Sequence, residues 1–104
     1  MSKPIKAVRI YISESDKADN HNLLNEIFSR LHDQHKVHGM TVFRGIAGFG
    51  VHGQVHSADL LRIHADLPLV IEFFDDPKIV DEALEWITRM VRPGHVIVWE
   101  AQVN

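Results

Sequence analysis

The sequence predicts an α+β fold in which two helices cover one face of a four-stranded antiparallel sheet. The prediction rests on segments with alternating apolar residues, on two segments whose apolar residues recur at helical spacing, and on glycine- and proline-rich breaks between them. Of the 104 residues, 45% are hydrophobic and 24% are charged, which is an ordinary globular composition. We therefore expect residues 1–104 to form a single domain, since a second one would need about 100 residues more.

Alternation defines the first strand. Val8, Ile10 and Ile12 fall on one face of residues 6–12, as expected for a half-buried strand. After a polar, turn-rich stretch, leucine, isoleucine and phenylalanine recur three and four positions apart, which predicts an amphipathic helix of about four turns. We expect Gly39 to end this helix, because glycine commonly follows a helix C-terminus.

The second half of the chain supplies the remaining elements. They are a strand at 40–44, a strand at 67–74, a helix with Asp76 as N-cap and Pro77 in its first turn that ends before Pro93-Gly94, and a strand over 96–103. Between the second and third strands, four glycines in the nine residues 45–53 exclude a regular element. We expect a long flexible loop over about 47–65, with one helical turn at 58–63.

The resulting order, β-α-β-β-α-β, is that of the ferredoxin-like sandwich. If the alternating residues of the first and third strands face the helices, Tyr11, Val70 and Phe74 point away from them. In the last strand, either Val96 and Val98 or Ile97 and Trp99 must also point away from the helices, because neighbouring residues of a strand face opposite sides. An apolar sheet face of this kind marks an interface, so we expect a homo-oligomer with its sheet faces turned inward.

Composition and motifs exclude several classes of function. The absence of cysteine excludes a disulfide scaffold, a cysteine-bound zinc and a thiol nucleophile. A formal net charge of −3 gives no footprint for nucleic acid. No leader and no apolar run of about 18 residues is found, so we expect a cytoplasmic protein that does not insert into membranes.

The motif Gly48-x-Gly50-x-x-Gly53 matches a dinucleotide fingerprint in its letters, but no helical stripe follows it. Paired carboxylates on one helix face, nucleophile motifs and phosphate loops are also missing, so we expect no enzymatic activity.

One segment resembles a known family. Gly39-Met40-Thr41-Val42, the run Arg44-Gly45-Ile46-Ala47-Gly48-Phe49-Gly50 and the later Asp66-Leu67-Pro68 are similar to PII signal-transduction proteins, and more closely to a PII-like family, the domain of unknown function 190. The resemblance covers residues 5–103. It implies a regulatory homotrimer that senses a small ligand in the cleft between subunits. The 47–65 loop would then engage a partner protein such as a membrane transporter or channel.

The resemblance also indicates where the ligand would bind. The candidate residues lie at the cleft and the loop base: Arg44, Gly45, Gly48, Phe49, Gly50, Arg89, Arg92 and Gly94. PII proteins hold nucleotide phosphates partly with a Gly-x-Gly-Lys loop before the last strand. The corresponding Arg92-Pro93-Gly94-His95 has one glycine and no lysine. An adenine nucleotide is therefore a possible ligand, but no phosphate-binding loop of this type supports it.

Eight histidines are the outlier of the composition. His32, His35 and His38 follow one another at the end of the first helix, where two imidazoles on one face can chelate a metal, although His35 also lies in line with the core residues of that helix. His52, His56 and His64 lie in the loop, and copies of them can converge in a trimer. They support the alternative function, a divalent-metal-binding trimer similar to the cation-tolerance proteins.

Overall fold

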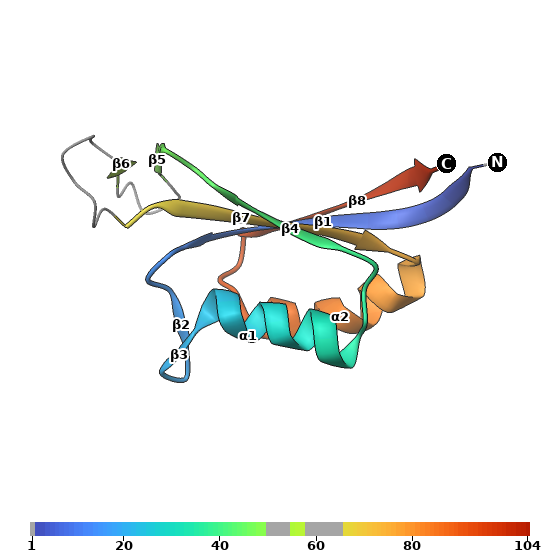
Figure 1. Ribbon diagram of the computed structural model, residues 1–104, viewed down its shortest axis with the longest axis horizontal. Helices are drawn as coiled ribbons and strands as arrows, with labels where there is room; N and C mark the ends of the chain where they lie inside the picture. The colour runs from blue at the N-terminus through green and yellow to red at the C-terminus, as the bar shows by residue number, and fades with distance from the viewer. Residues whose placement is uncertain (1, 50–54, 58–65) are drawn as a thin grey trace.

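Both helices lie on one face of the central sheet, and the opposite face is open (Figure 1). The structure is a computed structural model and describes residues 2–49, 55–57 and 66–104. Its elements in chain order are β1 (Lys3–Ser13), β2 (Lys17–Ala18), β3 (His21–Asn22), α1 (Leu23–Ser29), the π-helical segment η1 (Arg30–Gln34), β4 (Met40–Arg44), β5 (Ala47–Phe49), β6 (Val55–Ser57), β7 (Pro68–Asp75), α2 (Pro77–Met90) and β8 (Val96–Val103).

The central sheet has the strand order β4-β7-β1-β8, and every neighbouring pair is antiparallel. Ile10 of β1 lies opposite Ile71 of β7 on one side and Val96 of β8 on the other. With two helices on one face, this is the ferredoxin-like arrangement that the sequence predicts. No helix in the described part of the chain is long and apolar enough to cross a membrane.

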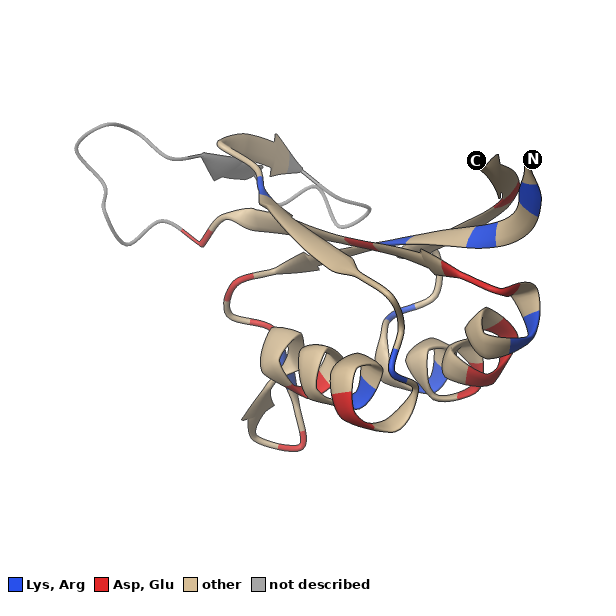
Figure 2. Cartoon of the chain, turned by 45° about the vertical axis from the view of Figure 1, so that its right-hand side comes forward, with Lys and Arg blue, Asp and Glu red and all other residues tan. Residues whose placement is uncertain are grey.

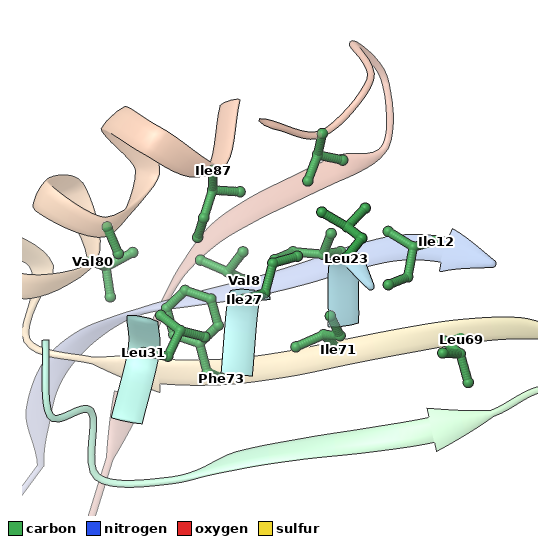
Figure 3. Packing of buried hydrophobic residues seen from close by; sticks show 13 residues of the cluster. Val8, Ile12, Leu23, Ile27, Leu31, Leu69, Ile71, Phe73, Val80 and Ile87 are labelled. Atoms are coloured by element: carbon green, nitrogen blue, oxygen red, sulfur yellow. The ribbon is translucent and has the colours of Figure 1, made fainter. Parts of the chain in front are cut away.

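The core lies between the sheet and the helices, where side chains of α1 and α2 cover those of β1 and β7 (Figure 3). Over residues 8–12 of β1 and 69–73 of β7 the predicted alternation is confirmed, since the residues facing the helices are buried and their neighbours are more exposed. The cluster comprises Val8, Ile10, Ile12, Leu23, Ile27, Leu31, Leu69, Ile71, Phe73, Val80, Ala83, Ile87 and Val91. Burying each large aliphatic side chain contributes about 1.5–3 kcal/mol, so this layer supplies the main favourable term of folding.

The second helix begins as predicted. Asp76 is its N-cap, and the carboxylate accepts a hydrogen bond from the backbone N–H of Lys78 at 3.2 Å, with Pro77 in the first turn. Val80, Ala83 and Ile87 form the buried stripe. The helix ends at Met90 and is followed by Val91 in an extended conformation, so the chain has left the helix before it reaches Pro93.

The end of the first helix differs from the prediction. The helix continues through η1 and is capped at His35, four residues before Gly39. Lys36 takes the left-handed conformation with φ of 51°. The N–H of Val37 then donates a hydrogen bond of 3.1 Å to the carbonyl oxygen of Leu31, which ends the helix. The left-handed terminating position, usually glycine, is therefore occupied here by lysine.

A short hairpin replaces the polar loop expected after the first strand. β2 and β3 pair with Lys17 opposite Asn22, and Asp19 and Asn20 form the two-residue turn with φ of 49° and 66°. Positive φ at both central positions is characteristic of a type I′ turn, and Asp and Asn tolerate it better than most residues. The sequence analysis missed this hairpin because its strands are two residues long and carry no apolar alternation.

Part of the predicted 47–65 loop is regular, since β5 and β6 pair with Ala47 opposite Ser57. The helical turn expected at 58–63 lies outside the described residues. Gly45 precedes β5, and a Cβ added there would meet the Cγ of Pro68 at 2.7 Å, while one at Gly48 would meet the same atom at 3.3 Å. Neither glycine has positive φ, so close approach of the proline ring, and not turn formation, requires them.

This contact yields the first prediction. We expect Gly45→Ala to lower the free energy of unfolding by about 1–3 kcal/mol, because the added methyl overlaps the proline ring beside a 2.7 Å hydrogen bond from the Gly45 N–H to the Pro68 carbonyl. Urea unfolding at fixed protein concentration measures the change. Gly39→Ala is the matched control, because a Cβ there meets nothing within 4 Å. Equal effects of the two substitutions would contradict the steric explanation.

The left-handed conformation of Lys36 yields a second prediction. Lys36→Gly should raise the free energy of unfolding by about 0.5–1 kcal/mol, since the relief of an unfavourable φ exceeds the added chain entropy of glycine. Lys36→Ala keeps the Cβ and serves as the control. Stabilisation by alanine equal to that by glycine would assign the effect to loss of the lysine side chain and not to the backbone.

Candidate functional site

Two groups of the predicted ligand-binding residues, around Arg44 and around Gly94, lie at one end of the sheet but on its two opposite edges. Arg44 closes β4, opposite Leu69 of β7. The turn that carries Arg92 and Gly94 leads into β8, and its next residue, His95, accepts a hydrogen bond from the Tyr11 N–H at 2.9 Å through the carbonyl oxygen. Three strand spacings of about 4.8 Å separate the two edges, or about 14 Å across one subunit.

Arg44 is held by the end of β1. Its Nε lies 2.9 Å from Oε1 of Glu14, and the Glu14 N–H donates to the carbonyl oxygen of Leu67 at 3.0 Å. The Arg44 side chain is 66% exposed. The ion pair therefore orients the guanidinium while leaving most of it accessible to an anion.

A serine and a carboxylate close the same end of the molecule. Ser15 donates to Asp66 twice, from the backbone N–H to Oδ1 at 3.1 Å and from Oγ to Oδ2 at 2.6 Å. The bonds join the chain leaving β1 to the chain entering β7. The sequence analysis did not find this pair, because the two residues lie far apart in the chain and neither belongs to a motif.

The Arg92–His95 turn is a type II turn. The His95 N–H donates to the Arg92 carbonyl at 3.2 Å, Pro93 occupies the second position, and Gly94 the third with φ of 87°. Nδ1 of His95 lies 3.0 Å from the carbonyl oxygen of Tyr11, which fixes the turn against β1. Here glycine is required for its backbone conformation, and Arg92 projects beside it into solvent.

Arg89 lies elsewhere. It belongs to the last turn of α2, where its Nε donates to the Glu85 carbonyl at 2.9 Å. It lines an open groove of about 530 Å³, whereas Arg92 lines a neighbouring hollow of about 90 Å³ and Arg44 lines neither. The structure thus separates the three arginines that the sequence analysis grouped. Of the other predicted ligand-binding residues, Gly50 lies outside the described residues, and only the backbone of Phe49, in β5, is described.

The helix-end histidines do not converge on a metal. Nε2 of His35 accepts a hydrogen bond from Nε1 of Trp86 at 2.6 Å, so His35 is a packing residue, as its position in the helix pattern indicated. His32 lies 2.8 Å from Asp33, and His38 contacts the buried Asp75. Groups of three or more metal-ligating side chains are absent from the described residues. The loop trio stays a prediction, because His52, His64 and the side chain of His56 lie outside the described part.

The open face of the sheet carries large apolar side chains with a charged pair among them. Between 38% and 48% of the surface of each is exposed: Tyr11, Phe43, Phe74, Ile97 and Trp99. Nε of Arg9 donates to Oε2 of Glu72 at 2.6 Å, and the guanidinium lies 5.9 Å from the ring centroid of Trp99. The hydrogen bond to Glu72, followed by one to Tyr11, raises the pKa of Arg9 above its ordinary value, so the guanidinium keeps its charge.

Comparison with known proteins agrees with this architecture. The model of the DUF190 family, described as “Uncharacterized ACR, COG1993”, matches residues 5–103. A UPF0166 protein of Methanocaldococcus jannaschii is 29% identical over 93 residues, which cover 89% of this chain and 84% of that protein. A UPF0166 protein of Aquifex aeolicus is 32% identical over 69 residues, 66% of this chain and 65% of the relative.

Among solved structures, a similar one is CPII of Thiomonas intermedia K12, a nitrogen regulatory PII-like protein bound to ADP, AMP and bicarbonate. It superposes with a TM-score of 0.66 at 23% identity, over 99% of this chain and 91% of that chain. A second CPII structure, bound to ADP and bicarbonate, gives a TM-score of 0.65 at 21% identity, over 99% of this chain and 91% of that chain. At these identities the likeness shows a PII-like fold.

Proposed function

The chain belongs to the DUF190 family, and on this premise we propose that it is a PII-like regulatory protein of the cytoplasm that acts by binding and not by catalysis. Its ligand is a small anion, in the first instance an adenine nucleotide, held in a cleft between two subunits of a homotrimer. The segment 47–65 transmits the occupancy of the cleft to a partner protein, a membrane transporter or channel. The ligands of CPII, which shares the fold, favour this ligand class.

The observation that carries the proposal is the division of the site between two sheet edges. Arg44 with Gly45 and Gly48 lies beyond one edge, and Arg92 with Gly94 lies beyond the other. A small anion does not span the width of the sheet. In a closed ring, however, one edge of each subunit faces the opposite edge of the next, which completes one site per interface.

The residue types suit a phosphate-bearing ligand. Arginine presents a planar fork of donors that matches phosphate oxygens, and Arg44 and Arg92 both project from exposed positions. Gly94 leaves the backbone of its turn open, with nothing within 4 Å of where a Cβ would lie. This arrangement takes the place of the glycine- and lysine-rich phosphate loop that the chain lacks.

The open sheet face supports the oligomer. Five large side chains at 38–48% exposure form an apolar surface of a kind that monomers rarely leave in water. The Arg9–Glu72 pair at its middle is already matched within one subunit, so burial of the face leaves neither charge alone. The alternative metal-binding function has no described residue that favours it.

Nucleotide titration tests the ligand. Isothermal titration with ADP, AMP and bicarbonate should give saturable heat with at least one of them, and Arg44→Gln or Arg92→Gln should each weaken binding about tenfold or more, because each removes charge-assisted hydrogen bonds. Lys78→Gln changes the charge equally at the far end of α2 and should leave the affinity within about twofold. Absence of heat with all three ligands would refute the proposed ligand class.

Light scattering tests the assembly. The wild-type chain should have three times the protomer mass of 11.9 kDa. Trp99→Glu places a charge on the open face and should shift the mass toward that of the protomer. Phe28→Glu is the matched control, an aromatic 51% exposed on the helix layer, and should keep the wild-type mass. A wild-type monomer, or dissociation by both variants alike, would contradict the sheet-face trimer.

A further inference from the structure

The groove beside Arg89 is a feature that the proposed function does not use. It lies where the β2–β3 hairpin meets the helix layer, and the hairpin projects from that layer at the end where α1 begins (Figure 1). Its volume is about 530 Å³, within the range of sites for small metabolites. The lining residues are Lys17, Ala18, Asp19, Arg30, Trp86, Arg89 and Met90.

Three cations from three separate elements converge on this groove. Lys17 comes from β2, Arg30 from the start of η1 and Arg89 from the last turn of α2, against a single acidic lining residue, Asp19. Elsewhere the described helix layer carries both basic and acidic residues, with several acidic ones on α2 (Figure 2). The convergence is therefore local, and it occurs in a chain whose net charge is −3.

The hydrogen bonds that these cations make within the protein do not use all of their N–H donors, so some remain for a ligand. Arg30 uses Nε on Glu26 at 3.1 Å and lies 5.1 Å from the Trp86 ring centroid. Arg89 uses Nε on the Glu85 carbonyl, a bond that also offsets the partial negative charge at the end of α2. In the part of the chain that the structure describes, Lys17 has no ion pair.

We propose that this groove binds a small phosphorylated metabolite, with the phosphoryl group between Lys17 and Arg89 and Arg30 at its side. A phosphate monoester carries about −2 charge and three acceptor oxygens at neutral pH, which matches three converging cations better than a single carboxylate does. Ala18, Met90 and Trp86 form the less polar lining for the carbon skeleton. The site lies within one subunit and does not depend on the proposed function.

The groove shares lining residues with the neighbouring hollow. Lys17 and Met90 line both this groove and the 90 Å³ hollow that contains Arg92 and His95. A ligand that repositions Lys17 changes the surroundings of the turn before β8. Occupancy of the groove is thus placed to modulate the turn without sharing its ligand.

Indole NMR with glycerol 3-phosphate as the probe tests the site. The chain has two tryptophans, so the indole signals are assigned with Trp99→Phe, and the Trp86 signal should move saturably while that of Trp99 stays fixed. Glycerol should leave both signals unchanged, and glycerate should bind at least tenfold more weakly. An unmoved Trp86 signal, or equal binding of glycerate, would overturn the proposal.

Variants separate this site from the cleft. Arg89→Gln should weaken binding about tenfold or more, and Lys17→Gln with Arg89→Gln should abolish it. Lys3→Gln with Lys78→Gln removes the same charge at the other end of α2 and should change the affinity less than twofold. Arg89→Lys keeps the positive charge but loses the planar pair of donors, so it should have an affinity between those of the wild type and Arg89→Gln. It serves as the test if the double variant does not fold.

Arg44→Gln should leave binding of glycerol 3-phosphate intact, because Arg44 does not line the groove. Loss of binding in that variant would assign the ligand to the cleft and overturn the groove. Conversely, failure of nucleotides to bind leaves the result with this probe unaffected.

Discussion

The pairing of β1 with β7 on one side and β8 on the other is the contact on which the remaining structure depends. Because both pairings are in register at Ile10, the apolar positions of three strands fall on the same face, and the helices have a continuous surface to cover. The same register aligns the ends of β4 and β8. A slip of one residue would turn the core residues outward and separate Arg44 from the level of the Arg92 turn.

That register gives one strand two roles. Val8, Ile10 and Ile12 build the core, whereas Arg9 and Tyr11 face the open side, where Arg9 bonds to Glu72 and lies over the Trp99 ring. Stability of the subunit and the chemistry of its outer face are therefore specified by alternate residues. Substitutions at the inward-facing positions remove core packing, whereas substitutions at Arg9 or Tyr11 leave the core contacts in place.

Elements with their own periodicity or caps were predictable, and features set by distant contacts were not. The last strand and the Asp76-Pro77 start of α2 follow from local sequence alone. The left-handed Lys36 carries no residue signal, because lysine has no preference for positive φ. The missed hairpin had one available signal, the consecutive Asp19 and Asn20, both tolerant of positive φ.

The candidate site divides in the same way. The resemblance named Arg44 and Gly94 as ligand-binding candidates, and the strand register brings both to the same end of the sheet. It named Arg89 together with Arg92, which lies three residues further along the chain. The helix ends at Met90, so the chain turns between them and the two arginines line different hollows.

The contact of Gly45 and Gly48 with Pro68 has a consequence for how such chains diverge. The strand that leaves the sheet and the strand that re-enters it touch where no side chain fits between them. The ring and the two missing side chains therefore behave as one unit under mutation. A side chain at the Gly45 position is accommodated most readily together with a smaller residue in place of Pro68, whereas at Gly48 a shift of the ring by a few tenths of an ångström suffices, so Gly45 and Pro68 are expected to covary most strongly.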